Sequence, residues 1–354
     1  MPSLSVVQFE MSQHGRRFGV VAGGEIIDVT AVESQLTRVT DAYQFAVSQG
    51  LTLANCLIGL AGRSTTRLSY ADLLARRNLA DGPVVRPPVD HADPYRVLIA
   101  GTGLTHLGSM KSRDQMHVST GTPTTVAANE PPKTDSRKMF EWGLAGGRPA
   151  PGSRGVAPEW FYKGNGTILR GHRDPLDIPD FTGDGGEEPE IVGCYVIDDQ
   201  GRPVRLGFAV GNEWSDHATE KQNYLYLAPS KLRTCSIGPE LIIGHDFQEI
   251  ALRCTVARGG KVLYDSGTLW SGEKHMCHSL ANMEDHHFKY SQHRNPGDIH
   301  LHYFGTSKLS YGTRDWQYAT GDEIQIETTE FSAPLVNVVH KSAESTIPYA
   351  TTPA

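Results

Sequence analysis

The sequence predicts a mainly β protein of the α+β class. Apolar runs of about four to eight residues recur along the chain, separated by turn signals of Gly, Pro, Asn and Asp. Few stretches show the spacing of apolar side chains that indicates a helix. The connections between several of the runs are long, so we expect sheets with both parallel and antiparallel pairing.

Length and composition limit the possible classes of protein. The chain has 354 residues, enough for one large domain or for a small domain and a larger one. A hydrophobic share of 38% and a charged share of 21% are typical of a soluble globular protein. The net charge of −7, without a cluster of Lys and Arg, argues against a nucleic-acid partner.

The cysteines and the N-terminus predict a location. The five cysteines form no Cys-x-x-Cys pair, and several lie in apolar runs, where a free thiol packs as a small hydrophobic group. This pattern fits a reducing compartment, so we expect a cytoplasmic protein. Residues 1–11 lack the basic and apolar regions of a signal peptide. No run reaches about 18 apolar residues, so we expect no membrane span and no membrane partner.

The chain is predicted to divide near residue 90. Residues 1–90 would form a small N-terminal domain and residues 91–354 a larger C-terminal domain, with the proline-rich segment Arg86–Val89 as the linker. In the N-terminal part, strands are expected at residues 6–9, 18–21 and 25–29, and helices at residues 41–49 and 69–75.

The C-terminal part contains most of the predicted strands. They are expected at residues 97–100, 160–165, 191–197, 206–210, 241–244, 249–256, 262–265, 299–304, 323–327 and 335–339. Helices are expected at residues 136–143, 215–223 and 273–292. The polar stretch 111–155 would be either a lid over a site or an ordinary surface insertion, and its composition leaves both possibilities open.

Three glutamates are candidates for a metal site. Glu188 and Glu190 lie two residues apart at the start of the apolar run Ile191–Ile197, so in a strand both carboxylates face the same side. The turn after that run and the returning strand would bring Glu213 back toward them. Three carboxylates on strand ends are hard oxygen ligands, which suit Mg²⁺ or Mn²⁺ better than zinc. The alternative is a set of solvated acidic strand ends.

Two further side chains are candidates for catalysis. His106 follows the glycine-rich segment Gly101–Gly103, which lacks the third glycine of a dinucleotide-binding fingerprint. An unperturbed imidazole has a pKa of about 6.5, so His106 would be a general acid or base, or else a hydrogen-bonded structural histidine. Lys163 would add positive charge to a site near the glutamates, act as a base if desolvated, or form an ion pair with a glutamate.

The histidine-rich stretch near the C-terminal end raises a zinc alternative. Seven histidines lie between His275 and His302. Because His286 and His287 are adjacent, and no His-x₃-His pair occurs on a helix that also bears a carboxylate, we favour the carboxylate site over a zinc site.

An ordered set of motifs between about residues 95 and 340 resembles the fumarylacetoacetate hydrolase superfamily. The matching pieces are Trp160–Lys163, Glu188–Glu190, Gly211–Ser215, Lys231, Asn295–Asp298, Gly305–Ser307, Thr320–Glu323 and Leu335–Asn337. Residues 1–90 resemble the small N-terminal domain of that family more loosely. The stretch from Gly101 to His117 resembles one branch, the 2-keto-3-deoxy-sugar-acid dehydratases that act on pentonates.

The resemblance implies a fold, a cofactor and a set of site residues. The fold would be a mixed β-sheet roll with a small N-terminal domain, and the protein a homodimer. The metal, Mg²⁺ (or Mn²⁺), would be held by Glu188, Glu190 and Glu213. The substrate would be a small α-keto acid, bound by Lys231, Gly305, Thr306 and Ser307.

Three positions depart from the family pattern. Glu213 stands where the family normally has an aspartate, and His217 stands where it has an arginine. The acid that usually pairs with the family's histidine is missing beside His106. The missing arginine argues against the substrate of the best-known members, which use it, and the missing acid argues against a C–C bond hydrolase.

The implied function is the dehydration of a 2-keto-3-deoxy pentonate to a product of the α-ketoglutarate semialdehyde type, through an enolate stabilised by the metal. One alternative is a hydrolase, or a decarboxylase, that acts on an acylpyruvate. Another is a non-catalytic protein that binds sugar acids. Such a binder would keep the carboxylates and lose the base, so the presence of His106 and Lys163 favours an enzyme.

Overall fold

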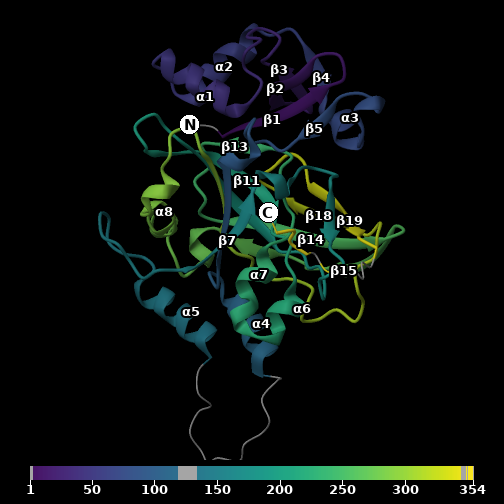
Figure 1. The fold of residues 1–354 in the computed structure, drawn as a ribbon. Helices are drawn as coiled ribbons and strands as arrows, with labels where there is room; N and C mark the ends of the chain where they lie inside the picture. Colours follow the sequence, from purple (N-terminus) through teal and green to yellow (C-terminus); the bar gives the residue numbers. More distant parts are fainter. Residues whose placement is uncertain (1–2, 119–133, 344–347, 349, 354) are drawn as a thin grey trace, which may run out of the picture.

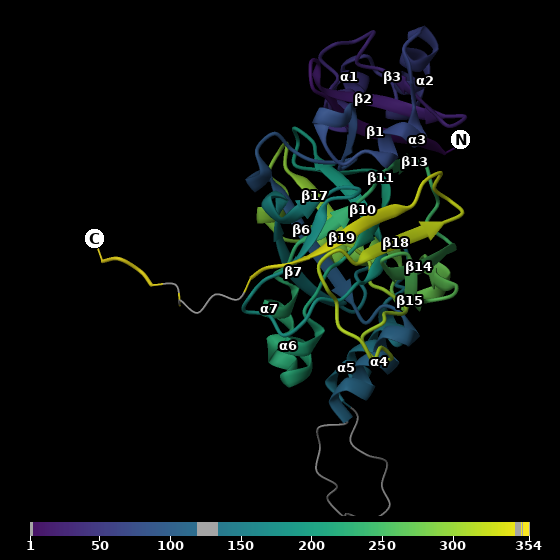
Figure 2. The same cartoon turned by 90° about the vertical axis from the view of Figure 1, so that its right-hand side faces the viewer.

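The computed structural model describes residues 3–118, 134–343, 348 and 350–353. Of the polar stretch predicted as a lid or an insertion, residues 119–133 lie outside the described part. Two β-sheets form the body of the molecule, with helices at both ends (Figures 1 and 2). The predicted class, a mainly β protein with mixed sheets, is confirmed.

The larger sheet has 13 strands within the described residues. In spatial order its main path is β4 (Arg67–Ser69), β3 (Glu25–Asp28), β2 (Gly15–Ala22), β1 (Leu4–Met11), β13 (Leu241–Ile243), β11 (Pro203–Asn212), β10 (Pro189–Ile197), β17 (Ile299–Tyr303), β6 (Val97–Gly103) and β7 (Glu159–Asn165). The strands that pair off this path are β5 (Val84–Arg86), β8 (Leu169–Arg170) and β12 (Cys235–Ile237). Only two pairs in this sheet, β17 with β6 and β12 with β8, are parallel in the described part.

The smaller sheet has six strands among the described residues. Its order is β15 (Lys261–Asp265), β14 (Ile250–Arg258), β18 (Glu323–Thr328), β19 (Leu335–Lys341) and β9 (Pro175–Ile178), with β16 (Leu269–Ser271) paired to β14. Every strand predicted from the sequence is present with shifts of only a few residues at its ends.

The helices lie at opposite ends of the molecule. Those beside β1 to β4 are α1 (Val39–Ser48), α2 (Leu53–Arg63) and α3 (Tyr70–Ala75). The helices at the other end are α4 (Leu107–Val118), α5 (Asp135–Gly146), α6 (His217–Gln222) and α7 (Leu227–Lys231), while α8 (Leu280–Phe288) lies at the side in the view of Figure 1.

Strand β10 is buried along its whole length because it is covered on both faces. Val192 and Cys194 belong to one apolar cluster, which extends to the N-terminal helices. Ile191 belongs to another, shared with the strands of the smaller sheet. A strand buried on both faces needs a continuous apolar run rather than an alternating one, which is what residues 191–197 provide.

The N-terminal strands continue directly into the larger sheet. Strand β1 pairs with β13, with Val6 opposite Leu241. Val20 and Leu57 share an apolar cluster with Leu301 of β17. The N-terminal unit therefore packs on the same core as the rest of the chain, and the boundary at residue 90 stays a prediction.

One predicted helix is wrong in length, and three helices of the described residues, α2, α4 and α7, were not predicted. The expected helix at 273–292 is a short 3₁₀ turn, Glu273–His275, followed by α8, because the Ser279 hydroxyl accepts from the Asn282 N–H and starts a new helix there. Helix α2 contains Gly59 and Gly62, which lower helix propensity and conceal it in the sequence. Helix α4 lies in the stretch whose polarity indicated a loop.

Candidate metal and substrate site

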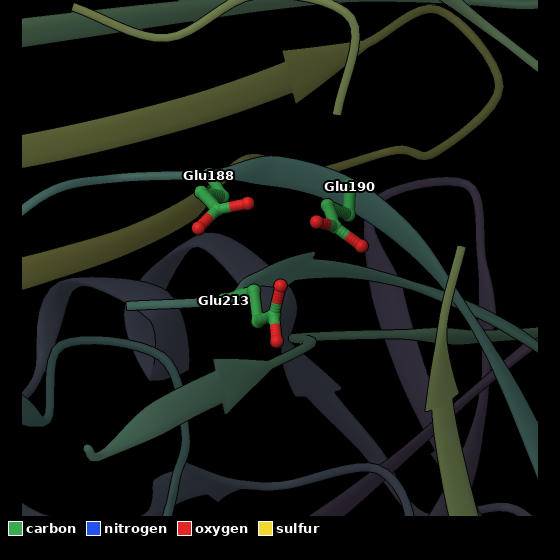
Figure 3. A group of neighbouring side chains, drawn as sticks. All are labelled: Glu188, Glu190 and Glu213. Atoms are coloured by element: carbon green, nitrogen blue, oxygen red, sulfur yellow. The ribbon is translucent and has the colours of Figure 1, made fainter. Parts of the chain in front are cut away.

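The hairpin of β10 and β11 brings the three predicted glutamates together. Its register pairs Pro189 with Asn212, so the residues just outside the hairpin, Glu188 and Glu213, lie side by side. The Glu213 N–H donates to the Glu188 carbonyl at 3.0 Å. One carboxylate oxygen from each of Glu188, Glu190 and Glu213 lies within 4.8 Å of the other two (Figure 3). All three side chains are buried, so they are not solvated strand ends.

A glycine makes room for one of these carboxylates. A Cβ atom on Gly101, at the end of β6, would lie 2.9 Å from Glu213 Oε1 and 2.4 Å from the ring of Phe161. Any larger residue would therefore displace the Glu213 side chain or the aromatic ring. The glycine-rich strand end seen in the sequence serves this close approach rather than a nucleotide.

Glu188 is the carboxylate with the strongest cationic partner. The Lys231 ammonium donates to Glu188 Oε1 at 2.5 Å and to Glu213 Oε2 at 3.3 Å. The His217 Nε2 atom lies 3.1 Å from the same Glu188 oxygen. Burial alone would raise the pKa of Glu188, but the Lys231 charge and the His217 hydrogen bond outweigh it and lower that pKa.

Glu190 and Glu213 are in the opposite situation. Burial, and then the neighbouring charges of Glu213 and Glu188, raise the pKa of Glu190 well above its ordinary value. Burial also raises the pKa of Glu213, against the pull of Lys231. Glu190 Oε2 accepts from the Gly305 N–H at 2.7 Å, but Oε1 of both glutamates is buried and accepts no hydrogen bond in the described part of the chain.

These residues fit a hard divalent cation. Buried oxygens without a donor need another source of positive charge, and close carboxylates repel one another until a cation binds between them. Within the described residues, Glu188, Glu190 and Glu213 are the one group of His, Cys, Asp and Glu whose ligand atoms converge in this way. Carboxylate oxygens are the ligands preferred by Mg²⁺.

Lys163, a predicted catalytic residue, lies beneath the site. It is fully buried on β7 and donates to the carbonyl oxygens of Trp214 (2.6 Å) and Lys231 (3.0 Å). Its ammonium is 3.9 Å from Glu213 Oε1, as in the predicted ion pair with a glutamate. Burial lowers the pKa of Lys163. Since Lys163 does not line the cavity at the glutamates, its contacts position Glu213 and Lys231 from behind.

His106, the other predicted catalytic residue, lines a neighbouring cavity of about 270 Å³ together with Ser307. The Thr105 hydroxyl donates to the Phe304 carbonyl at 2.7 Å, so its oxygen accepts from His106 Nδ1 at 2.9 Å. Nε2 of His106 therefore carries the lone pair, and it has no partner among the described residues. Burial lowers the pKa of His106 to about 3, which keeps this ring neutral.

The cavity at the glutamates is small, about 30 Å³, which is room for about two water molecules. Of the residues predicted to bind the substrate, Lys231, Gly305 and Thr306 line this cavity, and Ser307 does not. The structure thus gathers the predicted metal ligands and most of the predicted substrate contacts in one place. It puts His106 on the far side of the Gly305–Ser307 turn.

The cavity also has a wall of residues that no sequence motif marked. Arg113 on α4 and Glu220 on α6 line it. The Arg113 guanidinium is buried between Glu159 (2.6 Å) and Glu220 (2.9 Å). Burial lowers the pKa of Arg113, but the two carboxylates outweigh it and raise that pKa above its ordinary value. Polar composition indicated a surface segment here, and composition alone cannot reveal that a charge is buried by pairing.

The histidine cluster, defined as His287, His293, His300 and His302, is also buried. The Trp160 Nε1–H donates to His287 Nδ1 at 3.1 Å, so His287 Nε2 donates to His300 Nδ1 at 2.8 Å. His302 Nε2 and the Thr102 hydroxyl are 2.6 Å apart. These contacts join neutral rings to neutral partners.

No family model matches the sequence. A curated protein from Haloferax volcanii, described as a probable 2-keto-3-deoxyxylonate dehydratase, is 31% identical over 139 residues, which are 38% of this chain and 45% of that protein. The match thus spans under half the length of this curated relative.

Solved structures match over nearly the whole chain. The apo form of 2-keto-3-deoxy-D-arabinonate dehydratase superposes with a TM-score of 0.65 at 18% identity, covering 96% of this chain and 99% of that one. A structure of the same enzyme complexed with magnesium and 2,5-dioxopentanoate has the same TM-score and coverage at 17% identity. The fold is that of these dehydratases.

More distant structures share the fold as well. Maleylpyruvate hydrolase from Sphingobium sp. SYK-6 has a TM-score of 0.53 at 15% identity, covering 96% of this chain and 100% of that one. A 2-hydroxyhepta-2,4-diene-1,7-dioate isomerase from Mycobacterium marinum has a TM-score of 0.51 at 14% identity, covering 96% and 98%. The fold implied by the sequence resemblance is therefore confirmed.

In the described part of the chain, no single helix is both long enough and apolar enough to cross a membrane. Helices α1 and α2 reach that length and composition only when counted together, across a bend of 101°.

Proposed function

We propose that the protein is a Mg²⁺-dependent dehydratase of a 2-keto-3-deoxy sugar acid, a pentonate, with a product of the α-ketoglutarate semialdehyde type. The observation that carries the proposal is the trio of buried glutamates beside a cavity lined by Lys231 and Thr306; two of the three keep an oxygen that accepts no hydrogen bond from the described residues. The curated relative, described as a probable 2-keto-3-deoxyxylonate dehydratase, and the 2-keto-3-deoxy-D-arabinonate dehydratase structures support the substrate class.

The metal would be held by Glu188, Glu190 and Glu213, with Mn²⁺ as a possible substitute. When bound, it would supply a Lewis acid that favours negative charge on the substrate's carbonyl oxygen. Lys231, which already contacts two of the three glutamates, would add positive charge at the same place. The Gly305–Ser307 turn would bind the substrate carboxylate.

The proposed reaction removes one water overall. A base takes the proton at C3, the hydroxyl at C4 leaves as water with the help of an acid, and the double bond then migrates toward C5 to give an aldehyde. His106 would serve as the general acid or base from the neighbouring cavity, because its neutral ring keeps a free lone pair on Nε2. Lys163 would act through Glu213 and Lys231, whose positions it supports.

A C–C bond hydrolase acting on an acylpyruvate remains the second candidate, since a maleylpyruvate hydrolase shares the fold. Such a reaction needs a carboxylate to support the histidine that activates water. Here His106 Nδ1 is bound by the Thr105 hydroxyl, which favours the dehydratase.

Product analysis by NMR would test the proposal. The protein is incubated with Mg²⁺ and either a 2-keto-3-deoxy pentonate or an acylpyruvate. We expect a semialdehyde from the pentonate, lost with EDTA and in Glu190→Gln. Pyruvate and a carboxylic acid from the acylpyruvate, with the pentonate unchanged, would replace the dehydratase by the hydrolase.

The remaining parts of the proposal concern organisation. We propose a cytoplasmic homodimer with a domain boundary near residue 90 and a small α-keto acid as its ligand. Light scattering after gel filtration would give the oligomeric state, and a monomer at working concentration would contradict it.

A further inference from the structure

A set of contacts fastens two distant segments at the site, and we call it the clamp: Asp184 with Arg314, Glu187 with Ser310, Glu187 with Tyr318, and Glu190 with Gly305. The first segment runs from residue 184 to 190 and carries two of the candidate metal ligands. The second runs from residue 305 to 318 and follows β17. Positions 184, 187 and 190 meet positions 314, 310 and 305, so the segments run antiparallel.

Glu187 is the centre of the clamp. Its side chain is fully buried and accepts from the Ser310 N–H at 2.6 Å, the Ser310 hydroxyl at 2.8 Å and the Tyr318 hydroxyl at 2.6 Å. Its neighbour Glu188 lines the glutamate cavity, and Glu187 does not. Neither the sequence motif nor the proposed chemistry gives Glu187 a task.

Two of the residues between Gly305 and Ser310, the two ends that the clamp holds, line the glutamate cavity. Gly305 is held by Glu190, and Ser310 is held by Glu187. Thr306 and Leu309 lie between them and line the glutamate cavity. The wall formed by residues 305–310 is therefore hydrogen-bonded at one end to Glu190 and at the other end to Glu187, which belong to the same short acidic segment.

We propose that Glu187 is a positioning residue that sets the wall at 305–310 against the metal-binding carboxylates, so that an α-keto acid bound to the metal meets that wall. The proposal rests on the proposed function for the identity of the ligand. It requires hydrogen bonding by Glu187 and not its charge. An amide can replace the carboxylate, because its oxygen can accept from the Ser310 N–H while the two hydroxyls turn to accept from its NH₂ group.

The test compares Glu187→Ala and Glu187→Gln with a matched control, Glu240→Ala. Glu240 is also fully buried and also accepts from the N–H and hydroxyl of one serine, Ser332, but it does not line the cavity. Three quantities are measured in each variant: the affinity for Mn²⁺, the affinity for pyruvate in the presence of Mn²⁺, and the amide hydrogen exchange of residues 305–311.

We expect Glu187→Ala to keep its Mn²⁺ affinity, to lose about tenfold or more in pyruvate affinity, the scale of effects from groups that orient a ligand site, and to exchange faster at 305–311. Glu187→Gln should stay close to the wild type in all three. Glu240→Ala should be less stable and bind both probes normally. In turnover, Glu187→Ala should raise KM with a smaller change in kcat.

Several outcomes would overturn the proposal. They are normal pyruvate binding in folded Glu187→Ala, a Gln variant as impaired as the Ala variant, an equal loss in Glu240→Ala, and a wild type that binds Mn²⁺ but no pyruvate. If Glu187→Ala does not fold, Tyr318→Phe and Ser310→Ala decide by the same readouts. If pyruvate binding depends on Glu187 while neither keto acid is turned over, the positioning role stands and the proposed dehydration fails.

Discussion

Two buried polar regions of this molecule contain residue types that bind metals, and their hydrogen bonding in the structure differs. The glutamate site offers oxygens that converge and lack donors, at Glu190 and Glu213. The histidine cluster is bonded in a chain from Trp160 through His287 to His300. In the glutamate site the charges repel one another, whereas in the histidine cluster burial keeps the rings of His287, His300 and His302 neutral.

The difference teaches that the arrangement of lone pairs, and not the number of ligand-type residues, marks a functional site. Buried like charges lower the free energy of unfolding, and a cation that binds between them raises it again. Burial of neutral rings that satisfy one another contributes to stability and leaves little for a ligand to gain. Variants in each region test this distinction.

The largest expected effect is at Glu190. Glu190→Gln should abolish tight Mn²⁺ binding and reduce turnover by about 10²-fold or more, since an electrostatic contact to developing charge is lost. The metal-free variant should also be more stable by about 1 kcal/mol, because the raised pKa of Glu190 shows that its charge is disfavoured when buried. Titration calorimetry and urea unfolding give both values. Unchanged Mn²⁺ affinity would remove Glu190 from the site.

The next effect concerns His287. His287→Leu should cost about 2–3 kcal/mol of unfolding free energy, because it leaves the Trp160 N–H and His300 Nδ1 without partners. Mn²⁺ affinity should not change. A variant that lost Mn²⁺ binding while staying folded would show that the two regions act together.

Stability should fall as the pH drops below about 6.5. His300 and His302 have pKa values of about 3 in the folded protein because of burial, and about 6.5 when unfolded. Between these values the unfolded chain takes up protons that the folded chain does not, so each histidine should remove about 2 kcal/mol of stability at pH 5. Glu190, with its raised pKa, acts with the opposite sign in the metal-free protein.

Urea unfolding at several pH values, with and without Mg²⁺, separates these contributions. The part due to the histidines should be the same in both series. The stabilisation by Mg²⁺ should grow with pH, since binding needs ionised carboxylates. A metal effect that did not depend on pH would contradict the raised pKa of Glu190.

The smallest effect is expected for Thr102→Val. This change keeps the volume and removes the contact between the Thr102 hydroxyl and His302 Nε2, at a cost of about 1 kcal/mol. Mn²⁺ and pyruvate affinities should stay at the wild-type values. A change in either affinity would mean that the histidine cluster shapes the site through β6.

The strands could be predicted because their signal is local. Apolar runs bounded by turns predicted β10 and β11, and their hairpin alone brings Glu213 to Glu188. The helices were harder to predict, because their ends depend on capping residues and on tertiary packing that the spacing of apolar residues does not show. Ser279, the N-cap of α8, lies inside a stretch whose apolar spacing predicted one continuous helix. The glycines of α2 lower its helix propensity, and packing of its apolar face stabilises the helix.

The site could be predicted only in part, for a similar reason. The candidate metal ligands lie on one hairpin, so their spacing in the sequence reflects their spacing in the fold. Glu187, Arg113 and Glu220 act through partners dozens of residues away, and no local pattern marks such pairs. The placement of His106 depends on which way a turn at Leu104, with φ of 54°, directs the chain.

The central position of β17 in the larger sheet also means that this sheet cannot assemble fully until β17 has been synthesised. Its residues 299–303 sit between β10 and β6, pairing with segments about 100 and 200 positions earlier. During synthesis all three glutamates therefore leave the ribosome long before β17, the strand that pairs with both β10 and β6. Until then β10 and β6 have open edges, which bind other chains readily. A nonsense mutation before Ile299 should yield an aggregating fragment rather than a weak enzyme.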